Sequence, residues 1–163
     1  MPFRSNEVVC LTITTLDGKI QVPVDQSQGA TTGVWSPSGK SVLFCTSSQN
    51  LYIYNLKTQR SQAVAQNVEG PLAWREDGTA YAGISVVKEK GQTHKELSRF
   101  DREGHIMGGI PLEELQIDPR YPLYWISQTD EVALFARTPK GANCYLTNSD
   151  QLRRVTTSDD LHG

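Results

Sequence analysis

Histidine is the side chain most often used as a general base or metal ligand near neutral pH, and the sequence holds three: His94, His105 and His162. Metal-binding histidines recur at short fixed spacings, such as two histidines four residues apart on one helix face. None of the three has such a neighbour. His94 lies in a run of mixed charge, His105 in a turn and His162 near the end of the sequence. We therefore expect solvated histidines that bind no metal.

Paired carboxylates could perform acid–base chemistry on a glycosidic bond. The candidate pairs are Glu113-Glu114 and Asp159-Asp160. Adjacent residues of an extended chain point to opposite sides, so neither pair suits this chemistry. Four further aspartates fall in turns, where their carboxylates hydrogen-bond the local backbone. These are Asp17, Asp77, Asp101 and Asp130.

Motifs for nucleophilic or phosphate chemistry are missing from the sequence. It contains no Gly-x-Ser-x-Gly, no glycine-rich loop opening a helix and no EF-hand spacing. The three cysteines, Cys10, Cys45 and Cys144, form no CxxC and are odd in number, which argues against a disulfide framework or a zinc site. Cys45 and Cys144 lie in apolar runs and are expected to be buried. We expect no catalytic residue, no metal and no cofactor, and therefore no enzyme.

Charge and hydropathy narrow the classes of partner. Sixteen basic and 18 acidic residues give a formal charge of −2, whereas nucleic-acid binding needs a dense basic surface. No apolar run approaches the ~20 residues of a membrane span, and the first residues lack the apolar core of a secretory signal. We expect one globular domain over residues 1–163, in the cytoplasm, with proteins as partners.

The secondary-structure signals are those of β-strands. Residues 8–15 and 19–24 are rich in β-branched side chains and flank Asp17-Gly18, which predicts a hairpin. Residues 41–46 and 51–56 are apolar on both faces and should be covered on both sides. A charged loop is expected between residues 88 and 94. Two prolines, Pro111 and Pro119, limit residues 112–115 to one helical turn.

Three tryptophans mark a repeat. Trp74 lies 39 residues after Trp35, and Trp125 lies 51 residues after Trp74. Each is preceded by a short apolar approach and followed by a tight turn, a strand, a second turn and another strand. The unit is a four-stranded antiparallel sheet, and a period of about 40–50 residues is typical of propellers. We expect all three indoles to pack in the core.

One part of this repeat is specific enough to compare with a known family. The segment Trp35-Ser36-Pro37-Ser38-Gly39-Lys40, a strand, a turn and a second apolar strand ending at Asn55 resemble the repeat of TolB-like and WD-type β-propellers. The resemblance is strong in residues 33–65 and fair in 70–110. It is weak in 121–157, where the glycine of the turn that follows the tryptophan is absent. The resemblance implies that Gly39 and Gly78 accept positive φ in their turns, and that each indole lies between neighbouring blades.

The fold class expected is all-β, with about three and a half propeller blades. The hairpin would cover residues 7–25 and resemble the two outer strands, c and d, of a further blade. The blades would cover residues 32–66, 70–111 and 120–157. Closed propellers carry four or more blades, so we expect an incomplete ring, or one completed by a partner protein or a second copy. A small four-bladed ring and a bent β-sandwich are the alternatives.

The run from Lys88 to Lys95 is the most distinctive polar segment. In a propeller it would join strands b and c, on the face from which the connections between blades also emerge. This face resembles the partner-binding face of WD-type propellers. The candidate contact residues are Lys88, Lys90, His94, Arg120 and Tyr121.

The function expected is a non-catalytic scaffold that mediates protein–protein interaction in a larger assembly. Two alternatives remain. The chain could be the propeller portion of a peptidase-type enzyme whose catalytic residues lie outside it, or a TolB-like ligand-sensing domain. A fold alone does not decide between these functions.

Overall fold

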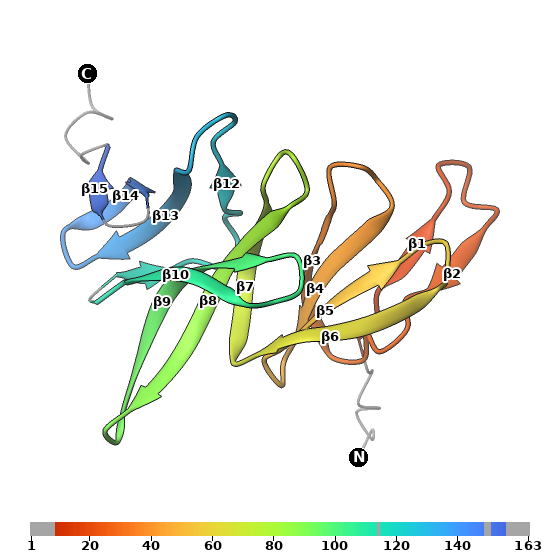
Figure 1. Ribbon diagram of the computed structural model, residues 1–163, viewed down its shortest axis with the longest axis horizontal. Coiled ribbons are helices and arrows are strands. Elements are labelled where there is room, and N and C mark those ends of the chain that lie inside the picture. Colours follow the sequence, from red (N-terminus) through yellow and green to blue (C-terminus); the bar gives the residue numbers. More distant parts are fainter. Residues whose placement is uncertain (1–8, 114, 149–150, 156–163) are drawn as a thin grey trace, which may run out of the picture.

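The computed structural model describes residues 9–113, 115–148 and 151–155. The regular elements of this part are strands, arranged in four antiparallel sheets. Figure 1 shows the sheets following one another in chain order along the long axis of the molecule. The expected all-β architecture of a hairpin and three blades is confirmed.

The first sheet is the hairpin of β1 (Thr12–Thr14) and β2 (Gln21–Pro23). Its turn contains Asp17-Gly18 as expected, with Gly18 at φ 70°. Asp17 Oδ1 accepts hydrogen bonds from Thr15 Oγ1 (2.6 Å) and Lys19 N (3.1 Å). The carboxylate therefore stabilises the turn itself. The paired strands are shorter than the predicted runs, and residue 8 lies outside the described part.

Blade one has the order β3 (Ala30–Trp35), β4 (Ser41–Thr46), β5 (Asn50–Asn55) and β6 (Arg60–Gln66). Every residue of β4 is buried, as its two-faced apolar pattern predicts. In β5, Leu51 belongs to the apolar cluster on one face and Tyr54 to the cluster on the other. Coverage on both sides is therefore confirmed for both strands, although only these two of the six residues of β5 are fully buried.

Blade two has the order β7 (Val68–Trp74), β8 (Ala80–Glu89), β9 (Gln92–Asp101) and β10 (Ile106–Pro111). The loop expected between residues 88 and 94 is wrong, because the β8–β9 pairing continues to Glu89 opposite Gln92. Lys90 and Gly91 both take positive φ, 49° and 77°. Two such residues form the tight turn that matches the twist of paired strands.

Blade three is less regular. Its strands are β11 (Gln116–Ile117), β12 (Tyr124–Trp125), β13 (Val132–Thr138), β14 (Gly141–Thr147) and β15 (Leu152–Arg154). Both β11 and β12 pair with β13, so two short segments share the place of one innermost strand. β11 was not predicted. Leu115 N donates to Leu112 O at 2.8 Å, but Glu113 takes φ 44°, so this segment is a tight turn and not the expected helical turn.

The core consists of three apolar layers, each between two consecutive sheets. Val42, Phe44 and Val24 belong to the layer between the hairpin and blade one. Leu43, Leu72 and Phe100 belong to the layer between blades one and two. Leu97, Leu134 and Tyr145 belong to the layer between blades two and three. The sheets therefore pack face to face, which is how propeller blades bury their apolar surface.

The tryptophans differ in burial. Trp74 packs against the layer shared with blade one, and Trp125 against the layer shared with blade two. Each indole thus faces the preceding sheet. Trp35 should face the hairpin by the same rule, but its exposed fraction is 51%. The expectation that it packs in the core is wrong, because the preceding sheet has only two strands within the described residues.

Candidate functional site

Three of the candidate contact residues lie on the β8–β9 hairpin of blade two. Lys88 and Lys90 are exposed near its tip. His94 is half-buried, and its Nε2 lies 3.0 Å from Glu96 Oε1. The hairpin therefore presents two exposed ammonium groups, without an ion pair among the described residues, beside an imidazole that contacts a carboxylate of its own strand.

Arg120 and Tyr121 lie elsewhere, in the connection before β12. Arg120 holds Asp118 through Nε (2.9 Å to Oδ1) and Nη2 (2.6 Å to Oδ2). The hydrogen bond from the Arg120 side chain, above all, lowers the pKa of Asp118 to about 2. Tyr121 packs against Phe135, with ring centroids 5.5 Å apart. The charge of Arg120 is therefore balanced within its own loop.

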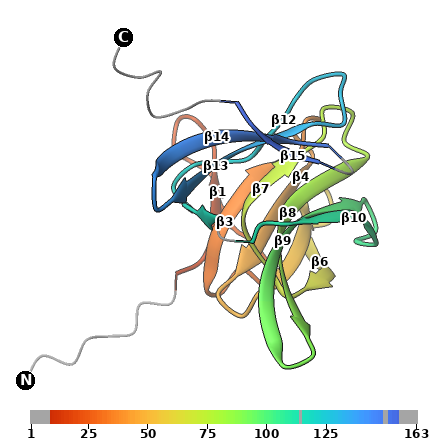
Figure 2. The ribbon, with the colours of Figure 1, turned by 90° about the vertical axis from the view of Figure 1, so that its left-hand side faces the viewer.

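The structure does not bring these five residues together. Figures 1 and 2 both show the tip of the β8–β9 hairpin extending away from the sheets, whereas β12 lies at the opposite side of the molecule. That these residues contact a partner stays a prediction. If they do, they belong to two separate surfaces, one on the β8–β9 hairpin and one before β12.

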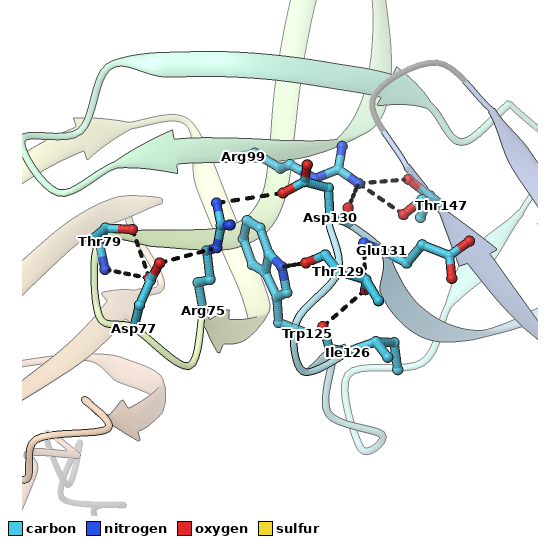
Figure 3. Close-up of polar contacts among 10 residues, drawn as sticks. All are labelled: Arg75, Asp77, Thr79, Arg99, Trp125, Ile126, Thr129, Asp130, Glu131 and Thr147. Atoms are coloured by element: carbon cyan, nitrogen blue, oxygen red, sulfur yellow. Dashed lines mark hydrogen bonds and ion pairs between the residues drawn. The ribbon is translucent and has the colours of Figure 1, made fainter.

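The densest polar network joins blades two and three (Figure 3). The Trp125 ring has the guanidinium carbons of Arg75 and Arg99 each 5.8 Å from its centroid. Its Nε1 donates to Thr129 O at 3.0 Å. Arg75 Nη1 lies 3.4 Å from Asp130 Oδ1. Cation–π contacts of this kind are worth about 0.5–2 kcal/mol each.

Arg99 is the buried centre of this network, with an exposed fraction of 6%. Its Nη2 donates to Asp130 O (3.0 Å) and Thr147 O (2.8 Å). Burial lowers the pKa of its guanidinium. Its Nε and Nη1 have no hydrogen-bond partner among the described residues. Arg99 therefore links strand c of blade two to two backbone carbonyls of blade three.

Sequence reasoning did not single out Arg99, although a signal existed. Leu97 and Arg99 are two residues apart on one strand and so point to the same face. Leu97 is fully buried in the layer shared with blade three. A cation on that face requires acceptors from the next blade, which is what Thr147 and Asp130 supply.

The predicted turn roles of the aspartates hold for three of the four. Asp77 accepts from Thr79 N (3.0 Å), and Asp101 accepts from His105 N (2.8 Å). Asp17 acts likewise, as described above. Asp130 differs, because its carboxylate pairs with Arg75 of blade two. The expected burial of the cysteines holds for Cys45, whereas Cys144 is half-buried.

The expected positive φ of Gly39 and Gly78 is confirmed, at 68° and 70°. His162, Asp159 and Asp160 lie outside the described residues. Within residues 9–113, 115–148 and 151–155, no cluster of three or more His, Cys, Asp or Glu side chains is suited to hold a metal ion. In the same part of the chain, no helix has the length and apolarity to cross a membrane.

A groove of about 310 Å³ opens at the free end of the arc, between the hairpin and blade one. Its lining contains no charged side chain among the described residues. The lining residues are Leu11, Thr12, Ile13, Thr14, Val24, Gly33, Trp35 and Val42. The groove thus combines one edge of β1 with the exposed indole of Trp35.

No protein-family model and no curated protein sequence matches the chain. Solved structures do. The acylaminoacyl peptidase of Pyrococcus horikoshii matches with a TM-score of 0.64 and 15% identity over 90% of this chain and 27% of that chain. TolB of Acinetobacter baumannii matches with a TM-score of 0.68 and 14% identity over 91% of this chain and 38% of that chain.

A third structure is itself a propeller domain. The β-propeller domain of the trilobed protease of Pyrococcus furiosus, described as having an open velcro topology, matches with a TM-score of 0.59 and 17% identity. The match covers 90% of this chain and 49% of that domain. These likenesses show the fold, which is that of β-propeller blades. The chain spans less than half the length of each of the three structures.

Proposed function

We propose that this chain is a non-catalytic β-propeller scaffold that mediates protein–protein interaction within a larger assembly. The observation that carries the proposal is the state of the two ends of the arc. Trp35 is 51% exposed at one end, and Tyr124 is 54% exposed in blade three at the other. Exposed aromatic side chains of this kind are enriched where proteins contact one another.

The polar groups support a structural role. Arg99, Asp130 and Thr147 hold two blades together, and Asp17, Asp77 and Asp101 hold turns. The polar groups of these side chains therefore form hydrogen bonds within the fold itself. The partners proposed are proteins, or a second copy that completes the ring, and the proposed compartment is the cytoplasm.

The similar structures give the alternatives their support. A peptidase and TolB both contain the same blade arrangement. In the first alternative the chain is the propeller portion of a peptidase-type enzyme, with catalytic residues outside these 163. In the second it senses a small ligand, as a TolB-like domain.

Isolation of the natural assembly tests the scaffold proposal. The protein would be purified under native conditions from its source cells and its complex measured by native mass spectrometry. We expect a mass well above that of one chain, containing at least one further polypeptide or copy. A single free chain, or a purified chain that hydrolyses peptide substrates, would contradict the proposal.

Charge reversal then tests the β8–β9 hairpin as a contact surface. We expect Lys88→Glu with Lys90→Glu to reduce recovery of the assembly, because both ammonium groups are exposed on this hairpin. Lys40→Glu is the control, since Lys40 is also exposed but lies on the β3–β4 turn. If the unchanged chain, the double variant and the control recover the assembly equally well, the hairpin is not part of the interface.

A further inference from the structure

Trp125 and Trp35 hold the same position in the repeat but have different surroundings. At the junction of blades two and three, Trp125 is flanked by Arg75, which directly follows strand a of blade two, and by Arg99 on its strand c. At the junction of the hairpin and blade one, the described residues form only the two outer strands. Trp35 therefore lacks whatever strands a and b would place over it.

β1 offers a free strand edge at this place. Leu11 O accepts from Val24 N (2.9 Å), and Thr15 N donates to Ile20 O (3.0 Å), so residues 11 and 15 bond toward β2. Backbone groups of successive residues in a strand point to opposite edges. Thr12 and Thr14 thus direct their N–H and C=O groups away from β2. In the described part of the chain, β1 pairs with β2 alone.

The hairpin is already fixed on blade one, so this edge is held in place. Asp25, just after β2, accepts from Ser61 N of the outermost strand β6 at 3.0 Å. Leu11 and Ile13 pack against the apolar layer that contains Val42 and Phe44. The groove is a direct continuation of that layer toward Trp35.

We propose that a β-hairpin of a separate partner protein binds in this groove, its second strand pairing antiparallel with β1 and its first strand lying beside Trp35. This proposal rests on the proposed function and names the surface through which the assembly forms. Addition of strands to an exposed edge is an established mode of protein recognition.

The repeat also fixes the chemistry of the occupant. The strands that hold the equivalent b position are β4, β8 and β13. Ser41–Thr46 of β4 is buried at every residue, and β8 is buried from Ala80 to Ser85. The second strand of the occupant is therefore a run of about six apolar or small residues. The uncharged lining of the groove fits such a strand.

The two ends of the 163-residue sequence do not provide this strand. Residues 1–8 contain Pro2, Arg4 and Glu7, and residues 156–163 contain Asp159 and Asp160, so neither tail holds an uninterrupted apolar run of that length. In a second copy, β4, β8 and β13 are each paired on both edges. A copy could supply a b strand only by opening one of its own blades.

The test uses the full chain labelled with ¹⁵N and an unlabelled synthetic peptide as the probe. The peptide has the sequence of residues 30–47, which is the a–b hairpin of blade one. We expect the peptide to slow amide hydrogen exchange at Thr12 and Thr14 by about tenfold or more and to shift the indole N–H resonance of Trp35. The control peptide carries Phe44→Pro, which removes a donor from its second strand.

A chain variant locates the pairing independently. Thr14→Pro removes one donor from the free edge of β1 and no donor to β2. We expect it to weaken peptide binding about tenfold. Circular dichroism checks that the variant keeps the fold of the unchanged chain.

Three results would overturn the proposal. One is that the amides of Thr12 and Thr14 exchange at the same rate with the peptide as with the control peptide. Another is protection that rises with the concentration of the chain alone, which would make a second copy the occupant. The third is binding that leaves the Trp35 resonance unshifted. A large natural assembly combined with any of these would leave the scaffold proposal standing, whereas a free single chain would remove both.

Discussion

Replacing Trp125 by alanine is expected to lower the free energy of unfolding by about 3 kcal/mol. The indole packs against the layer between blades two and three, contacts Arg75 and Arg99, and donates its N–H to Thr129 O. Removing it would leave a cavity at the junction and an unpaired carbonyl. Urea denaturation followed by circular dichroism measures the loss without relying on tryptophan emission.

Trp35→Ala is the matched control. The residue holds the same position in the repeat, but its side chain lies at the open end of the arc and is 51% exposed. Since most of its surface is not buried by other blades, we expect a loss below about 1 kcal/mol. Equal losses for the two variants would mean that Trp35 is covered in solution, and the arc would not be open there.

Gly104→Ala is expected to destabilise the protein by about 3 kcal/mol. Gly104 lies in the turn between β9 and β10 with φ 95°, a conformation that side chains disfavour. An added Cβ would lie 2.0 Å from Val64 O and 2.7 Å from Val64 C, both backbone atoms of β6 in blade one. The turn must therefore move away from the neighbouring blade. The midpoint of thermal unfolding would report the loss.

Gly91→Ala separates backbone strain from this contact. Gly91 has φ 77°, and no heavy atom lies within 4 Å of an added Cβ. We expect a loss of about 1 kcal/mol from the left-handed conformation alone. If Gly104→Ala costs no more than Gly91→Ala, the close approach of blades one and two at Val64 does not exist in solution.

Much of the fold follows from local sequence. Trp35-Ser36-Pro37-Ser38-Gly39 predicts the turn between β3 and β4, where Gly39 has φ 68° and its N–H donates to Ser36 O. The apolar run of residues 41–46 predicts a buried strand, and all six residues are buried. Such features depend on a few adjacent residues, so the sequence contains the information.

Features that depend on neighbouring sheets are harder to read. The exposure of Trp35 follows from the two strands absent beside β1, which no residue near Trp35 encodes. The length of the β8–β9 hairpin depends on positive φ at Lys90, a residue that rarely adopts it without support from paired strands. The role of Arg99 depends on carbonyls of Asp130 and Thr147, which are distant in sequence. These three features depend on how the blades are arranged, and the residues near each position do not determine that arrangement.

The open arc is the central claim, and the separation of its ends tests it most directly. Spin labels at Lys19, on the tip of the β1–β2 hairpin, and Lys140, on the β13–β14 turn, would be placed by cysteine substitution in a chain carrying Cys10→Ser and Cys144→Ser. Pulsed electron spin resonance then measures the distance between them. An open arc predicts one long distance, close to the longest dimension of the molecule in Figure 1. A short distance, with the hairpin beside blade three, would mean a closed four-bladed ring and would contradict the account.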